Sequence, residues 1–267
     1  MFPVRHCKVV HFVRHGEGYH NVAGKKDYSQ YKRWDLEDAH LTAHGWEQAH
    51  ALRKHLAQLP EPLNVEAVIM SPLSRALQTA VGAFGGDACQ SGDPGKVLMV
   101  AQDAVPEKQV QHEAVSSAGC PPFIAWEYCR EHLGLHPCDR RGKVSMLQKT
   151  YPAVDFSLIE TEEDELWKPD SRETHAEIRA RGAAFIKWLL ARPERRLAVV
   201  SHSSFLFYLM QNYGHQISTT VQGELRRWYE NCEMRTVIIS DGGGDSGGLD
   251  PLWFPGGHKL DGYTDKS

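Results

Sequence analysis

Strand-like and helical segments alternate along this chain, and this alternation constrains the fold more than any other feature. Five β-branched or aromatic runs predict strands, at residues 8–13, 67–70, 96–101, 197–200 and 235–240. Helical periodicity predicts helices over residues 42–59, after Ser71-Pro72 (with the proline in the first turn), over 173–190 and from 205. Because parallel strands are joined by helical crossovers, the pattern predicts a three-layer, doubly wound α/β fold: a mainly parallel sheet flanked by helices.

The sequence as a whole is consistent with one domain spanning residues 1–267. Its 267 residues, 41% of them hydrophobic, are sufficient for a single large core. Residues 16–40 are polar and predict a loop, and residues 103–171 lack a clean period. We interpret 103–171 as an insertion packed over the carboxyl-end face of the sheet. The glycine-rich tail at 241–267 predicts a surface segment.

Composition excludes several classes of partner. The net charge of −4 and the pI near 6.4 give no basic patch for nucleic acid. The six cysteines include no C-x-x-C pair, which indicates reduced thiols in an intracellular protein. The N-terminus carries no signal core and no apolar run is long enough to span a bilayer, so the sequence predicts a cytoplasmic protein without a membrane partner. The oligomeric state stays open.

Polar clusters follow three of the predicted strands. They are Arg14-His15-Gly16-Glu17, Ser71-Pro72-Leu73-Ser74-Arg75 and Ser201-His202-Ser203. Ligands of parallel α/β sheets bind beyond the carboxyl ends of the strands, so we expect these clusters to meet in one crevice. Two guanidinium groups suit a phosphate, a neutral imidazole can attack phosphorus, and a second imidazole can stabilise the phosphoryl oxygens.

These motifs resemble the signature of the histidine phosphatase superfamily, the phosphoglycerate-mutase-like proteins. The first cluster resembles its nucleophile motif, and Leu41-Thr42-x-x-Gly45-x-x-Gln48-Ala49 resembles the helix that follows. Further matches are Ser71-Pro72-Leu73-x-Arg75-Ala76-x-Gln78-Thr79-Ala80, Val199-Val200-Ser201-His202 and Asn231-Cys232-Glu233. The motifs run in family order from about residue 8 to 240. The nearest pattern is that of the mutase-like branch of plants, algae and fungi.

The resemblance implies a role for each of these residues. His15 would become phosphorylated, and the phosphoryl group would be bound by Arg14, Asn21, Arg75 and His202. Family members also carry a carboxyl group that protonates the leaving oxygen. The candidates here are Glu127 and Glu131, and we favour Glu131 because it precedes Gly134 closely.

Substrate contacts beyond the phosphate are less constrained. Arg140 and Arg141 follow the candidate acid and are either a second anion site or a solvated surface pair. His20 is close enough in sequence to line the entrance. Despite 15 histidines, the chain has no His-Glu-x-x-His spacing, so we predict no metal and no cofactor, and expect a small phosphorylated metabolite as the ligand.

Three functions remain at this point. Hydrolysis of phosphate monoesters through a phosphohistidine on His15 is favoured, because the chain lacks the Glu-Arg-His-Tyr-Gly stretch of true mutases. A 2,3-bisphosphoglycerate-dependent phosphoglycerate mutase is the alternative. A catalytically silent scaffold on the same fold is the third, which the presence of both histidines and both arginines disfavours.

Overall fold

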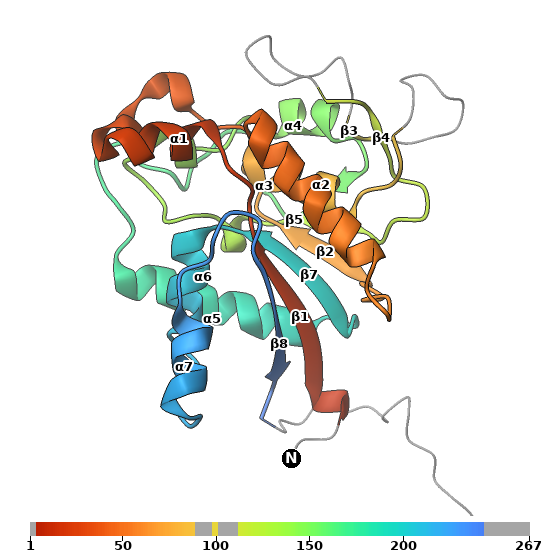
Figure 1. Ribbon diagram of the computed structural model, residues 1–267. Helices are drawn as coiled ribbons and strands as arrows, with labels where there is room; N and C mark the ends of the chain where they lie inside the picture. Colours follow the sequence, from red (N-terminus) through yellow and green to blue (C-terminus); the bar gives the residue numbers. More distant parts are fainter. Residues whose placement is uncertain (1–3, 89–97, 101–111, 243–267) are drawn as a thin grey trace, which may run out of the picture.

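A six-stranded, mainly parallel sheet forms the centre of the computed structural model, which describes residues 4–88, 98–100 and 112–242 (Figure 1). Its strands are β1 Cys7–Arg14, β2 Ala67–Met70, β5 Phe123–Ala125, β6 Val154–Asp155, β7 Arg196–Ser201 and β8 Met234–Ser240. They lie in the order β6-β5-β2-β7-β1-β8, with only β8 antiparallel to its neighbour. The α/β fold expected from the sequence is therefore confirmed.

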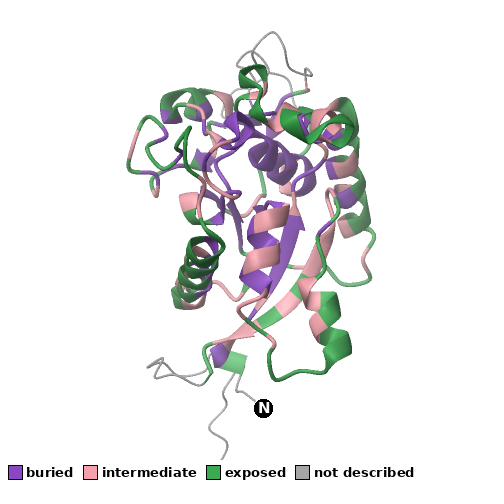
Figure 2. Ribbon diagram, turned by 90° about the vertical axis from the view of Figure 1, so that its left-hand side faces the viewer, coloured by how far each residue is buried: buried purple, intermediate pink, exposed green. Residues whose placement is uncertain are grey.

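Helices cover both faces of this sheet. The α-helices are α1 Tyr19–Lys26, α2 Ala43–Ala57, α3 Ser74–Phe84, α4 Val144–Thr150, α5 His175–Ala191, α6 Ser203–Met210 and α7 Thr219–Arg226. Short 3-10 helices occupy Val4–His6, Tyr28–Lys32, Trp34–Leu36, Glu127–Cys129 and Pro137–Asp139. The strands β2 and β5 are buried throughout, whereas β8 and α7 are more exposed (Figure 2).

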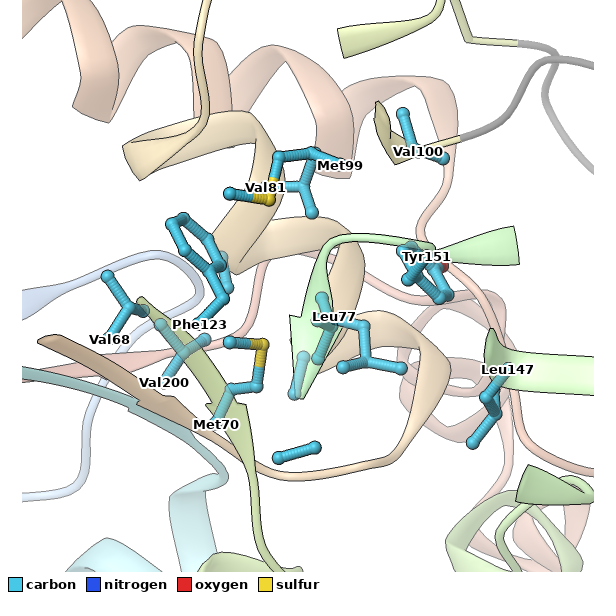
Figure 3. Close-up of a cluster of buried hydrophobic side chains, with 14 of the residues drawn as sticks. Val68, Met70, Leu77, Val81, Met99, Val100, Phe123, Leu147, Tyr151 and Val200 are labelled. Carbon is cyan, nitrogen blue, oxygen red and sulfur yellow. The ribbon is translucent and has the colours of Figure 1, made fainter. Parts of the chain in front are cut away.

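Alternate residues of the inner strands enter two separate hydrophobic clusters. Val68 and Met70 of β2 pack with residues of α2, α3 and α4, in the cluster drawn in Figure 3. Ala67 and Ile69, one position away along the same strand, pack with α5 and α6. Because successive side chains of a strand point to opposite faces, this alternation identifies the two sides of a three-layer fold.

The region between residues 103 and 171 differs most from expectation. Instead of forming only an insertion, it supplies β5 and β6 to the central sheet. These strands are three and two residues long, too short to show periodicity, and β5 is buried on both faces. The strand expected at 96–101 is seen as β3 Leu98–Val100, which pairs with β4 Val115–Ser116 in a separate two-stranded sheet.

Smaller corrections concern loops and helix ends. Residues 16–40 contain α1 and two 3-10 helices rather than one loop, and α7 was not expected. Pro72 precedes α3, whose N-cap is Leu73, so the proline is not in its first turn. Parts of the expected strand at 96–101 and of the 103–171 region, and the tail from residue 243, lie outside the described residues. Among the residues described, no helix has both the length and the apolar character needed to cross a membrane.

Candidate active site

His15 lies at the carboxyl end of β1 and is 1% exposed. Its Nδ1–H donates to the Gly16 carbonyl at 2.7 Å, and this bond assigns the ring proton to Nδ1. The lone pair therefore resides on Nε2, which accepts a hydrogen bond from Nε of Arg75 at 3.3 Å. An imidazole in this tautomer presents a nucleophilic nitrogen in a fixed direction.

The loop after His15 is braced by side chains of α2 and α3. The Gly16 N–H donates to Thr79 Oγ1 at 2.9 Å, and the Glu17 N–H donates to Gln48 Oε1 at 2.8 Å. A Cβ at Gly16 would lie 2.6 Å from the Gly45 carbonyl oxygen, so the two segments approach more closely than a side chain permits. The polar and glycine positions of the two helix motifs thus fix the backbone that carries the histidine.

The turn that precedes β8 provides a second brace. The Cys232 N–H lies 3.1 Å from the Arg14 carbonyl oxygen and 3.2 Å from that of His15. Asn231 Nδ2 donates to the same His15 oxygen at 3.1 Å. Cys232 adopts a φ of +59°, a conformation that non-glycine residues rarely take, which turns the backbone toward β1. Asn231-Cys232 therefore holds the nucleophile segment from the opposite side.

Arg75 enters from the first turn of α3 and is fully buried. Its guanidinium donates to the Cys138 carbonyl at 2.6 Å and pairs with Asp139 at 2.7 Å. The backbone and hydroxyl of Ser74 both donate to Asp38, whose side chain thereby caps the helix that carries Arg75. The arginine is positioned before any substrate arrives.

Two further imidazoles surround His15. The His202 ring centroid lies 5.1 Å from that of His15, and the His20 centroid lies at 5.4 Å. Both nitrogens of His202 and Nδ1 of His20 are buried without a hydrogen-bond partner. Buried polar atoms are rarely left unpaired, so these nitrogens identify a place where a polar ligand would be bound.

The charges of the site keep these rings neutral. Burial, followed by the charge of Arg75, lowers the pKa of His15, His20 and His202 well below the ordinary value for histidine. Arg14 contributes in the same direction at His15 and His20. Neutral imidazoles beside permanently charged guanidinium groups form a site that attracts an anion and retains a nucleophile.

A pocket opens in front of His15. It is lined by Arg14, His15, His20, Asn21, Tyr28, Tyr31, Glu131, His136, Cys138, Asp139, Arg172, Ser203 and Ser204. Arg75 and His202 are not part of this lining and lie behind it, beside His15. The expected residues Arg14, His15, Asn21 and Glu131 all reach the pocket, and so does His20.

The structure separates the two candidate acids. Glu131 lines the pocket, and its carboxylate accepts hydrogen bonds from the backbone of His132 at 2.9 Å and of Phe205, in the first turn of α6, at 3.1 Å. Glu127 does not line the pocket, because its carboxylate pairs with Arg130 and Arg141, each at 2.8 Å. Of the two, Glu131 is the carboxyl group within reach of a bound ester.

Arg140 and Arg141 do not reach the pocket. Arg140 pairs with Glu37 at 2.6 Å on the surface. Arg141 is buried, and besides Glu127 its guanidinium donates to the carbonyls of residues 142 and 161–163. With their donors used in this way, neither arginine supplies the second anion site considered from the sequence, and we do not retain that interpretation.

Several lining residues were missed by the sequence reasoning. Tyr28 and Tyr31 lie in a segment taken for a loop, His136 and Asp139 lie in the one taken for an insertion, and Arg172 directly follows that insertion. None of these residues falls in one of the motifs, and none belongs to a segment with helical or strand periodicity. Their proximity to His15 depends on the path of the chain between elements, which local pattern does not encode.

Fold and site together define a class: a mainly parallel α/β protein with an anion pocket at the strand ends, built from arginines and neutral histidines. The model of the histidine phosphatase superfamily (branch 1) matches residues 10–88. A phosphoglycerate mutase-like protein of Arabidopsis thaliana is 46% identical over 91% of this chain and 88% of its own length. A probable phosphoglycerate mutase of Arthroderma benhamiae is 28% identical over 78% of this chain and 58% of its own.

A solved structure with the same fold is that of a putative α-ribazole-5'-P phosphatase from Escherichia coli. It is 18% identical, with a TM-score of 0.50, over 88% of this chain and 91% of the other. The identity to the plant relative over almost the whole chain decides the family. This chain belongs to the histidine phosphatase superfamily, among its phosphoglycerate mutase-like members.

Proposed function

We propose that this protein hydrolyses phosphate monoesters of small molecules through a phosphohistidine on His15, without a metal ion. The observation that carries the proposal is the state of His15: a neutral ring with its proton on Nδ1 and Nε2 facing Arg75, beside imidazole nitrogens that lack partners. Nucleophile and anion-binding groups are thus assembled in one place.

In the first step, the Nε2 lone pair of His15 attacks phosphorus and the bond to the ester oxygen breaks. Glu131, carrying a proton, gives it to the departing oxygen, so the alcohol leaves neutral. Arg14 and Arg75 stabilise the phosphoryl oxygens as charge redistributes, and for this Arg75 turns donors toward them. His202 and Asn21 complete the shell of the phosphoryl group.

In the second step, a water molecule attacks the phosphorus of the phosphohistidine. Glu131, now a carboxylate, accepts the proton of that water, and the bond from phosphorus to Nε2 breaks. Inorganic phosphate leaves, His15 returns to its neutral form and Glu131 is again protonated. The same carboxyl group therefore serves as acid and then as base.

The test is release of phosphate from a panel of esters in the presence of a chelator. The panel contains sugar phosphates, phosphoglycerates, nucleotides and p-nitrophenyl phosphate. We expect release by the wild type and loss of at least about 10⁴-fold in His15→Ala. His44→Ala, which removes an exposed histidine of α2, is the matched control. Equal activity of His15→Ala and wild type would refute the proposal.

A phosphoglycerate mutase is the second candidate, because the relatives are named a phosphoglycerate mutase-like protein and a probable phosphoglycerate mutase. A mutase returns the phosphoryl group to bound product instead of to water. Interconversion of 2- and 3-phosphoglycerate that requires 2,3-bisphosphoglycerate, with no release of phosphate, would favour it over the hydrolase.

A further inference from the structure

The pocket wall that leads outward from His15 is made of aromatic rings. The His20 ring lies 5.9 Å from that of Tyr31, which stacks on His136 at 5.4 Å with an angle of 22°. Tyr28 contacts both of the latter, at 5.2 Å from Tyr31 and 5.8 Å from His136. We refer to His20, Tyr28, Tyr31 and His136 as the aromatic wall; all four line the pocket.

The inner part of the wall is held rigidly. The Tyr31 ring lies over Gly24 of α1, where a Cβ would be only 2.3 Å from two ring carbons. A ring packed this closely on the backbone of α1 is restricted in its orientation, which is the arrangement expected of a preformed subsite.

The outer part of the wall is open. The Tyr28 side chain lies at the pocket mouth and is 69% exposed, the largest exposed fraction among the aromatic residues described. When a ligand covers a large exposed ring beside a pocket, the burial of apolar surface stabilises the complex. The wall thus runs from the buried nucleophile to an uncovered tyrosine.

The wall offers rings rather than charge. Burial lowers the pKa of His20 well below its ordinary value, and burial together with Arg172 lowers that of His136 to about 4. Both imidazoles are therefore neutral near pH 7. Arg172, which lines the same pocket, already donates to the Gly134 carbonyl at 2.7 Å and lies 3.8 Å from Asp139. The wall therefore offers a leaving group ring faces and neutral hydrogen-bonding atoms rather than a cation.

We propose that the aromatic wall is the leaving-group subsite, and that the preferred substrates are phosphate monoesters whose alcohol carries an aromatic or heteroaromatic ring close to the ester oxygen. The inference rests on the proposed function and specifies its substrate class. Aromatic rings pack on one another with offset or edge-to-face geometry, and this contact stabilises a complex more than burial of the same apolar area alone. A saturated group of equal size buries the same area without that gain.

The experiment compares benzyl phosphate with cyclohexylmethyl phosphate. Both release a primary alcohol, so the intrinsic ease of breaking the ester bond is similar, and both leaving groups are of similar size. We expect kcat/KM to be about 3- to 10-fold higher for the benzyl ester, the range given by an aromatic pair. Equal values, or a preference for the saturated ester or for glucose 6-phosphate, would overturn the inference.

Variants of Tyr28 at the pocket mouth test whether this ring produces the preference for the benzyl ester. Tyr28→Leu, which removes the ring at an exposed position and should not impair folding, should bring the ratio of the two kcat/KM values close to one. Tyr28→Phe retains the ring and should retain the ratio. Tyr19→Leu removes an exposed tyrosine of α1 that does not line the pocket, and should also retain it. A ratio unchanged in Tyr28→Leu would show that the wall does not set the preference.

Binding separates this inference from the proposed function. Benzylphosphonate and cyclohexylmethylphosphonate cannot be hydrolysed, and their dissociation constants can be measured by calorimetry. We expect tighter binding of the benzyl compound to the wild type, lost in Tyr28→Leu, whether or not esters are turned over. Turnover that depends on His15 but no ring preference in either assay would refute the subsite and leave the hydrolase standing.

Discussion

The two sides of the pocket are built in different ways. On the phosphoryl side, His15 and His202 directly follow β1 and β7, and Arg75 lies in the first turn of α3, the helix after β2; the three strands are neighbours in one sheet. On the leaving-group side, Glu131 and His136 lie on irregular chain between β5 and α4. Strand spacing sets the first arrangement, and side-chain contacts with distant segments set the second.

Those distant contacts form a buried network behind Glu131. Arg130 donates to both Asp164 and Glu127, and Glu127 also pairs with Arg141. Arg181 of α5 donates to the carbonyls of Tyr128, Arg130 and Glu131. Because the sheet positions the phosphoryl site and loops position the leaving-group side, substitutions in the loops can alter the leaving-group side without altering the phosphoryl site.

After His15→Ala, removing Arg75 should give the largest effect, and it tests the phosphoryl side. Arg75→Ala takes away a buried guanidinium beside the nucleophile and leaves Asp139 with only its longer contacts to Arg172 and His136, so we expect kcat/KM to fall about 10³-fold. Arg140→Ala, which breaks only the surface pair with Glu37, should change it less than about twofold. A larger loss from Arg140→Ala would restore that residue as a substrate ligand.

Breaking the buried network should cost stability. In Asp164→Asn, Arg130 loses the more deeply buried of its two charged partners and keeps Glu127, and we expect the free energy of unfolding at pH 7 to drop by about 3 kcal/mol in urea titrations. Burial alone would raise the pKa of Asp164, but the hydrogen bonds and charge of Arg130 outweigh it and hold the pKa below its ordinary value.

The sign of the pH dependence follows from that direction. A carboxyl group with a depressed folded-state pKa stabilises the fold above its unfolded pKa, about 3.9, and this contribution is lost as the pH falls through the folded value. The difference in the free energy of unfolding between wild type and Asp164→Asn should therefore be largest at neutral pH and become smaller below about pH 4. The exposed Asp170→Asn should stay within about 0.5 kcal/mol of wild type. A difference that grows as the pH falls would contradict a depressed pKa of Asp164 in the folded protein.

Replacing the acid should affect poor leaving groups selectively. Glu131→Gln cannot donate a proton, so we expect about a 10²-fold lower kcat/KM for alkyl phosphates and a small change in kcat/KM for p-nitrophenyl phosphate, whose leaving group needs no proton. We compare kcat/KM because it reports the first step, in which Glu131 acts as the acid, and not the second, in which it acts as the base for every ester. The comparison variant is Glu127→Gln, which weakens the pairs with Arg130 and Arg141 and should lower stability instead. An inactive Glu127→Gln beside a fully active Glu131→Gln would show that the wrong carboxyl group was chosen.

The smallest expected effect concerns Arg181, a positioning residue. Arg181→Ala frees the carbonyl of Glu131, and we expect kcat/KM for alkyl phosphates to fall about tenfold because the acid is misplaced. The kcat/KM for p-nitrophenyl phosphate should change little, and Arg181→Lys should recover part of the loss. Arg179→Ala, an exposed position of the same helix, is the control. Equal losses for both esters would indicate general destabilisation instead.

The same contrast explains what the sequence could predict. His15, Arg75 and His202 each follow a run of β-branched residues, so local pattern placed them at strand ends and the parallel sheet brought them together. Tyr31, His136 and Arg172 follow no such run. Their positions depend on contacts such as the stack of Tyr31 on His136, between residues more than 100 positions apart, and no local rule encodes such a contact.

Strand prediction failed for a related reason. β5 holds only Phe123, Ile124 and Ala125, and it is a strand because β2 and β6 lie on either side of it. Likewise, the choice between Glu127 and Glu131 depends on where Arg130 and Arg141 point, which spacing along the chain does not reveal.

The contact of Asn231 with His15 has a consequence for how the protein is made. The two residues are 216 positions apart, so the reactive histidine leaves the ribosome long before the segment that holds its carbonyl. Chains that end before residue 231 lack β8, the neighbour of β1 at the sheet edge. A nascent chain therefore carries its nucleophile early and completes the support for it only after residue 231 and β8 have been synthesised, so that reactivity is acquired together with the finished sheet.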